Sequence, residues 1–247
     1  MNLLEVQGLR KTYPAFRLED VSFSVPEGAV MGLIGRNGAG KSTTLKSILG
    51  LVHPDAGRVE MFGREFSENE RYIKENIGVV LGGIDFYPKK KVRTITDVTR
   101  RFYSNWQEEK YRHYLDLFAI DENKRVDQLS SGMRVKYLLA LALALSHNAR
   151  LLILDEPTSG LDPVSRDELT ELLRRIAADG TRSVLFSTHI TSDLEKCASH
   201  ITFIQEGRLQ RSDSLAGFMA HYADLGSTLE EIIVAAERRP YDADAII

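Results

Sequence analysis

The first third of the chain alternates apolar and polar positions with the period of β-strands. Leu4 and Val6 alternate with polar neighbours in residues 3–7, and residues 18–25 repeat that pattern. A Pro-Glu-Gly turn at 26–28 precedes a continuous apolar run at 29–34, and residues 58–62 form another candidate strand. The chain is therefore predicted to open with several β-segments.

From about residue 94 to 146 the apolar spacing becomes helical. Aromatic side chains lie among charged residues in this stretch, and we expect them mainly in the core: Phe102, Trp106, Tyr111, Tyr114 and Phe118. Residues 138–145 are apolar nearly all round, which is typical of a buried helix.

Strands and helices alternate in the remainder of the chain. Buried strands are predicted at 151–154 and 183–187, and an amphipathic helix with Pro163 in its first turn at 163–178. This order predicts βαβ units and a parallel sheet, so the fold class is α/β. Residues 201–204 and 208–210 predict a hairpin. The tail after about 212 is expected to be partly helical, with frayed residues at 240–247.

Composition narrows the class of protein. The chain has 247 residues, 43% of them apolar and 27% charged, which suits one large domain or a domain carrying a subdomain. The net charge is −3 without a clustered basic face, so we expect no nucleic-acid partner. The single cysteine, Cys197, is expected to pack within a helix in a reducing compartment. We find no signal peptide and no apolar run near the roughly 20 residues of a membrane span, so a cytoplasmic location is expected.

A glycine-rich segment between the strand at 29–34 and the following helix predicts phosphate binding. Glycines allow backbone N–H groups to converge on phosphate oxygens at a helix N-terminus. Lys41 would reach the β- and γ-phosphates of ATP, and the Ser42 hydroxyl would bind Mg²⁺. The alternative is a glycine-rich turn with a solvated lysine. The candidate binding residues are Gly35, Asn37, Gly38, Ala39, Gly40, Lys41, Ser42 and Thr43.

Two acids follow the apolar strand at 151–154. Open α/β sheets place their chemistry at the carboxyl ends of their strands. Asp155 is therefore a candidate Mg²⁺ ligand, and Glu156 a candidate base for the attacking water. Without the glycine-rich loop upstream, a structural role such as capping the next helix would explain these acids equally well.

The segment Leu129-Ser130-Ser131-Gly132-Met133 resembles the LSGGQ signature of ATP-binding cassette (ABC) proteins, with Ser131 and Met133 as departures. Ser130, Ser131 and Gly132 would bind nucleotide, although a plain helix N-cap is the alternative for these residues.

Further segments match the ABC family in order along the chain. Tyr13 matches the aromatic residue that stacks on adenine, with Phe16 as a competitor and core packing as the alternative. Asp162 ends a segment that matches the D-loop at the dimer seam, and His189 matches the histidine that contacts the γ-phosphate.

The resemblance covers residues 2–215 and implies the ABC ATPase fold. That fold is a P-loop core with an N-terminal antiparallel β-subdomain and a helical subdomain inserted near 83–146. The ATPase domain would span 1–215, followed by a helical tail at 216–247. The resemblance is strongest to small ATPases paired with ABC-2-type permeases in Gram-positive bacteria, such as Ytr-type and phenol-soluble-modulin exporters.

This resemblance implies partners as well as an activity. The chain would hydrolyse ATP with Mg²⁺ as one half of a nucleotide-sandwich dimer, with a second copy or a paralogue as the other half. It would drive an ABC-2-type permease on the inner face of the membrane and export an amphipathic or antimicrobial peptide. Alternatives are a soluble ABC ATPase in translation or DNA repair, and a non-hydrolysing nucleotide-binding regulator.

One departure keeps the last alternative open. The family usually has a glutamine that contacts Mg²⁺ and the permease where this chain has Gly82, and Asp85 is a candidate substitute. Phe86 and Tyr87 would either face the permease or pack in the core.

Overall fold

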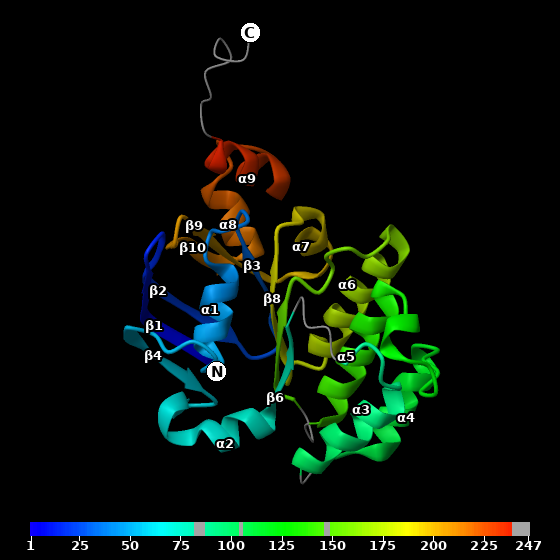
Figure 1. Ribbon diagram of the computed structural model, residues 1–247. Helices are drawn as coiled ribbons and strands as arrows, with labels where there is room; N and C mark the ends of the chain where they lie inside the picture. Colours follow the sequence, from blue (N-terminus) through cyan, green and yellow to red (C-terminus); the bar gives the residue numbers. More distant parts are fainter. Residues whose placement is uncertain (82–86, 104–105, 146–148, 239–247) are drawn as a thin grey trace.

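The computed structural model describes residues 1–81, 87–103, 106–145 and 149–238 (Figure 1). Gly82, Asp85 and Phe86 lie outside the described residues, as does the segment expected to fray at 240–247. Among the residues that the structure does describe, no helix has both the length and the apolar character needed to cross a bilayer.

One mixed sheet runs through the molecule. Its ten described strands have the order β5-β4-β1-β2-β10-β9-β3-β8-β7-β6. The strands are β1 (Asn2–Tyr13), β2 (Phe16–Pro26), β3 (Val30–Ile34), β4 (Ala56–Met61), β5 (Arg64–Glu65), β6 (Ile77–Val80), β7 (Leu151–Asp155), β8 (Ser183–Thr188), β9 (His200–Gln205) and β10 (Arg208–Ser214).

The parallel half of the sheet confirms the predicted α/β class. Strands β3, β8, β7 and β6 pair in parallel, and β9 pairs in parallel with the other edge of β3. Every residue of β3, β7 and β8 is buried, as expected for strands that are covered on both faces. Because the chain crosses over between these strands, the carboxyl ends of β3, β8 and β7 are adjacent.

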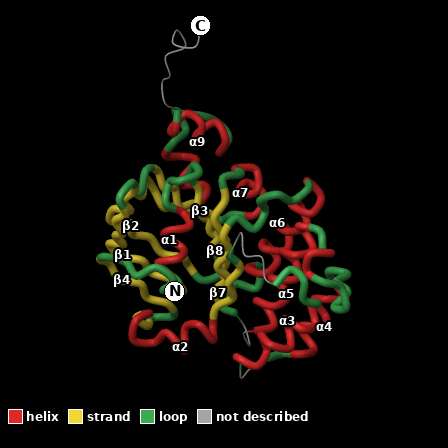
Figure 2. The backbone as a smooth tube through the Cα atoms, viewed as in Figure 1, coloured by secondary structure: helices red, strands yellow, loops and turns green. Residues whose placement is uncertain are grey.

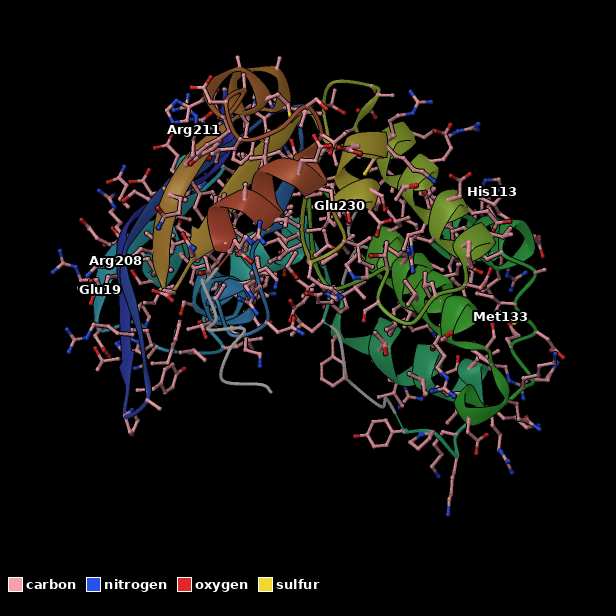
Figure 3. All side chains as sticks on the ribbon, turned by 90° about the horizontal axis from the view of Figure 1, so that it is seen from above. Glu19, His113, Met133, Arg208, Arg211 and Glu230 are labelled. Carbon is pink, nitrogen blue, oxygen red and sulfur yellow. The ribbon has the colours of Figure 1, made fainter. Side chains whose placement is uncertain are left out.

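The antiparallel half is built from β1, β2, β4 and β5. Buried residues on β2 alternate with more exposed ones, so one face packs and the other meets solvent. Strand β1 continues to Tyr13, beyond the predicted 3–7, because it keeps pairing with β2 as far as Tyr13 and Phe16. The halves join where Arg208 of β10 pairs with Glu19 of β2, both labelled in Figure 3.

Helices cover both faces of the parallel strands and form a separate group beside them (Figure 2). The α-helices are α1 (Lys41–Ile48), α2 (Phe66–Asn76), α3 (Val92–Thr99), α4 (Glu108–Leu117), α5 (Ser131–Leu145), α6 (Pro163–Ala177), α7 (Thr191–Cys197), α8 (Leu215–His221) and α9 (Leu229–Glu237). Helix α2 was not expected from the apolar pattern, since Ile73 is its only buried residue.

Helices α3 and α4 and the first part of α5 share a core of their own. At its centre the hydroxyl of Thr96 lies 2.6 Å from that of Tyr111 and 3.1 Å from that of Tyr137. The prediction that the aromatic residues here are mainly core was wrong for Phe102, which is 79% exposed in a short 3₁₀ turn after α3. Figure 1 shows this helical group and the antiparallel strands on opposite sides of the molecule.

The C-terminal helices pack on the parallel sheet. Phe218 of α8 and Leu229, Ile232 and Ile233 of α9 belong to the same core as β7 and β8, whereas Val234 is exposed. Helix α9 therefore lies against the core of the parallel sheet rather than apart from it.

Candidate active site

The glycine-rich loop lies between β3 and α1, as predicted. It leaves the sheet at Gly35, where an added Cβ would come within 2.1 Å of the Ile204 carbonyl oxygen, so only glycine fits this path. Gly40, at φ 113°, precedes the first turn of α1. The loop thus presents its backbone at the N-terminus of α1, where the helix dipole favours anions.

The buried ammonium of Lys41 is held by the loop itself. Its Nζ donates to the carbonyl oxygens of Gly35 at 2.7 Å and Arg36 at 3.2 Å. The same Nζ lies 3.4 Å from Oε1 of Glu156. The positive charge of Lys41 therefore lies between the loop carbonyl oxygens and the carboxylate of Glu156, which directly follows β7.

The carboxylates of Asp155 and Glu156, at the end of β7, contact different side chains. Asp155 Oδ1 accepts from the hydroxyls of Ser42 at 3.1 Å and Ser187 at 2.6 Å. Glu156 has a left-handed backbone, φ 49°, and its N–H donates to the Ser187 hydroxyl at 2.9 Å. Since a non-glycine residue at positive φ costs roughly 1–3 kcal/mol, this turn is fixed by its surroundings. Each of the two carboxylates thus contacts one residue at the start of α1 and one at or just after the end of β8.

His189 follows β8 and reaches the second acid. Its Nδ1 lies 2.8 Å from Glu156 Oε2, so the carboxylate contacts Lys41 through one oxygen and His189 through the other. Three segments distant in sequence thus meet at the carboxyl ends of β3, β7 and β8.

A pocket of about 600 Å³ opens over this cluster. Most of the predicted loop residues line it, together with the predicted base and histidine. Its lining residues are Ala15, Phe16, Asn37, Gly38, Gly40, Lys41, Ser42, Thr43, Glu156, Ser159 and His189.

Other predicted site residues do not line this pocket. Gly35 and the buried Ala39 belong to the loop without lining it, and Asp155 acts beneath it through Ser42. Tyr13, at the end of β1, is 39% exposed, whereas Phe16 of the same hairpin does line the pocket. The competing aromatic residue thus has the closer position.

The signature segment also lies away from the pocket of its own chain. Ser130 uses its hydroxyl to accept from the Met133 N–H in the first turn of α5, and Ser131 donates to the Gly160 carbonyl oxygen at 3.1 Å. Both serines are exposed, whereas Gly132 is buried against Ser165. In Figure 3 Met133 lies on the helical side of the molecule.

Asp162 caps the N-terminus of α6. Its carboxylate is the N-cap of α6 and accepts from the N–H groups of Val164 and Ser165, both at 3.0 Å. The hydrogen bonds from Ser165 and Val164 hold the pKa of Asp162 below its ordinary value. As a cap alone this residue stabilises the turn between the acids and α6.

Sequence reasoning missed two residues of the site. Ser187 was read only as part of a buried strand, yet it contacts both Asp155 and Glu156. Glu237, at the end of α9, accepts from the N–H of Arg36 in the glycine-rich loop. Neither residue belongs to a local motif, so only the folded chain reveals these contacts.

Comparison with known proteins agrees with this geometry. Residues 18–159 match the ABC transporter family. The bacitracin transport ATP-binding protein BcrA of Bacillus licheniformis is 32% identical over 84% of this chain and 68% of its own length. The ABC transporter ATP-binding protein YtrB of Bacillus subtilis is 30% identical, over 84% of this chain and 70% of its own. The Nod factor export ATP-binding protein I of Burkholderia orbicola is 39% identical over 76% of this chain, and the match spans only 62% of that relative.

Solved structures show the same fold. A structure of the ATP-binding subunit of an ABC transporter superposes with a TM-score of 0.83 at 28% identity and covers 96% of this chain and all of the other. The chain therefore belongs to the ABC transporter family. Within that family it is an ATP-binding subunit and an ATPase, which confirms the predicted fold, enzyme class and likeness to the Ytr type.

Proposed function

We propose that this chain hydrolyses ATP as one half of a nucleotide-sandwich dimer and thereby drives a separate membrane permease for export. The observation that carries the proposal is the contact chain Lys41–Glu156–His189 at the floor of one open pocket. The names of relatives that act in bacitracin transport and Nod factor export support an export role.

The glycine-rich loop would bind the ATP phosphates. Lys41 contacts loop carbonyl oxygens and Glu156, and a bound phosphate would attract its ammonium more strongly because it carries more negative charge. Moving Lys41 onto phosphate would free Glu156 Oε1 to accept a proton from water. The other oxygen, held by His189, would keep the carboxylate oriented toward the phosphate.

The donor set beside the loop fits Mg²⁺. Ser42 and Asp155 place a hydroxyl and a carboxylate 3.1 Å apart, and Mg²⁺ usually takes one or two protein oxygens together with substrate phosphates and water. When bound, the ion would offset phosphate charge. Ser187, which donates to the same carboxylate, would keep its other oxygen available for the metal.

The adenine would stack on the β1–β2 hairpin. Phe16 lines the pocket and is the stronger candidate, and Tyr13 at the same hairpin is the second. Substitution of each aromatic residue by alanine, with measured ADP affinity, separates them.

The position of the signature supports a dimer. Ser130 and Ser131 are exposed, and neither lines the pocket of its own chain. Together with Gly132 they would complete the pocket of a second chain, with Asp162 near the seam. ATP between two chains would then favour closure, and hydrolysis would release it.

The permease would bind beside the helical group, on the cytoplasmic face of the membrane where ATP is supplied. Tyr87 is 68% exposed at the start of this group and is the candidate for this contact. An ABC-2-type permease and an amphipathic or antimicrobial peptide as cargo are the partner and substrate that we propose.

Size-exclusion chromatography of Glu156→Gln protein with and without Mg·ATP tests the dimer. We expect a shift from monomer to dimer with ATP. Adding Ser131→Arg should abolish the shift while ATP binding persists, because the change is outside the pocket of its own chain. Thr94→Arg, at another exposed hydroxyl residue in the first turn of a helix, is the matched control and should leave the shift intact.

Failure of Glu156→Gln protein to dimerise while binding ATP would contradict a self-sufficient homodimer. In that case a paralogous ATPase would be the required second half, and mixing candidate pairs would identify it.

A further inference from the structure

The C-terminal helix ends directly on the glycine-rich loop. The Arg36 N–H donates to Oε1 of Glu237 at 3.1 Å, and the Arg36 guanidinium Nε lies 3.8 Å from Oε2. The Glu237 side chain is 8% exposed. One carboxylate thus contacts both the backbone and the side chain of a loop residue that precedes it by 201 positions.

The peptide group that Glu237 holds also positions the lysine, because the carbonyl of that group belongs to Gly35 and accepts from Lys41 Nζ at 2.7 Å. The Arg36 carbonyl oxygen accepts from Lys41 Nζ at 3.2 Å and from the Ala39 N–H at 3.1 Å. The Arg36 N–H therefore donates to a carboxylate, and the Arg36 carbonyl oxygen accepts from the ammonium group of Lys41. Arg36 is therefore the single residue that links Glu237 to Lys41 through hydrogen bonds.

Helix α9 is held by hydrogen bonds at both ends, so the backbone that carries Glu237 has a fixed position. At its start, Thr228 and Glu231 form a capping box, and Glu195 of α7 accepts from the Leu229 N–H at 2.7 Å. At its end, the Gln205 side-chain amide donates to the Ala236 carbonyl oxygen at 3.2 Å. The helix connects α7, which begins two residues after His189, with the loop.

The placement of Glu237 is unfavourable apart from this contact. An acid in the last turn of a helix faces the negative end of the helix dipole. Burial raises the pKa of Glu237 above its ordinary value, against the lowering effect of the Arg36 N–H. The carboxylate also borders a cavity of about 410 Å³ whose other walls include Asn37 and Gly38, which line the phosphate pocket too.

We propose that Glu237 is a positioning residue of the nucleotide site. By accepting the Arg36 N–H it fixes the first turn of the loop, so that Lys41 is held at a defined position beside the site where the phosphates would bind. Helix α9 is thereby coupled to nucleotide occupancy. Since coupling of two binding events is reciprocal, nucleotide should in turn stabilise the docked end of α9. The inference rests on the proposed nucleotide role of the loop.

The test compares Mg·ADP binding to the full chain and three variants. Glu237→Ala removes the acceptor, and we expect its dissociation constant to rise about tenfold, the usual scale for a lost charge-assisted hydrogen bond. Glu237→Gln keeps an acceptor oxygen without the charge and should restore most of the affinity. Glu230→Ala, which changes an exposed acid of the same helix (Figure 3), should bind as the unaltered chain does.

Hydrogen exchange supplies a second measurement that needs no variant. In the unaltered chain, Mg·ADP should slow amide exchange in residues 229–237, and Glu237→Ala should remove that protection. Thermal unfolding of each protein checks that it is folded. If Glu237→Ala does not fold, the effect of Mg·ADP on α9 exchange in the unaltered chain still decides.

Three results would overturn the proposal: unchanged affinity in Glu237→Ala, equal losses in the alanine and glutamine variants, or no nucleotide effect on α9 exchange. Failure of the unaltered chain to bind Mg·ADP is a different outcome and would count against the proposed function itself.

Discussion

Nδ1 of His189 lies 2.8 Å from Oε2 of Glu156. The other oxygen of that carboxylate lies 3.4 Å from Lys41, so a single acid connects the loop lysine and the residue that follows β8. The contact with His189 orients Glu156 from the side opposite the loop. The two residues therefore form one unit, in which the histidine would hold the acid and the acid would accept the proton.

Glu156→Gln removes the ability of this side chain to accept a proton but keeps its size and its contact with His189. The amide keeps the size of the side chain and can still pair with His189, but it cannot accept a proton from water. We expect phosphate release to fall by about 10²–10⁴-fold, the range of general-base catalysis, while Mg·ATP binding persists. Steady-state phosphate assays and equilibrium binding measure the two quantities. An unchanged rate would show that water attack does not depend on Glu156.

His189→Ala should reduce turnover more than affinity. Loss of the imidazole leaves Glu156 without the partner that orients it, so we expect kcat to drop by about 10²-fold with a small change in KM. His113→Ala is the control, because His113 is exposed on α4 in the helical group (Figure 3). Equal effects of the two substitutions would refute a specific role for His189.

Ser187→Ala tests the residue that sequence reasoning missed. Its hydroxyl serves Asp155 and the Glu156 N–H, and the loss should destabilise the fold by about 1–3 kcal/mol and also lower the hydrolysis rate. Ser183→Ala is the matched control, since Ser183 begins the same strand and donates to the Pro26 carbonyl oxygen at 2.8 Å, away from the site. Urea unfolding should show similar losses of stability for both variants. Phosphate release should slow only in Ser187→Ala.

The sequence predicted those parts of the site that depend on neighbours along the chain. The glycine-rich loop and the acids at the end of β7 follow from strand ends, because parallel strands bring their carboxyl ends to one edge of the sheet. His189 was predicted only from the resemblance to the ABC family. Ser187 and Glu237 could not be found this way, since their partners are set by tertiary packing. The choice between Tyr13 and Phe16 likewise depends on the path of a hairpin whose extent the pattern underestimated.

The pH dependence of stability should report the burial of Cys197. Burial, aided by the negative charge of Asp193, raises the pKa of this thiol from 9.0 to about 12. Between these values the unfolded thiol loses its proton while the native thiol keeps it, so the unfolded state binds fewer protons and stability falls as pH rises. Near pH 10 the loss relative to pH 8 should be about 1.4 kcal/mol.

Cys197→Ala isolates this contribution. The variant keeps the buried Tyr111 and Tyr137, whose pKa values burial also raises, so their effects cancel in the comparison. The free energy of unfolding in urea at pH 8 and pH 10 should fall more for the unaltered chain than for the variant, whatever the cost of the truncated side chain at pH 8. Parallel pH dependence in both proteins would contradict this prediction, because it would mean that the native thiol ionises as readily as the unfolded one despite its burial at the end of α7 in the core.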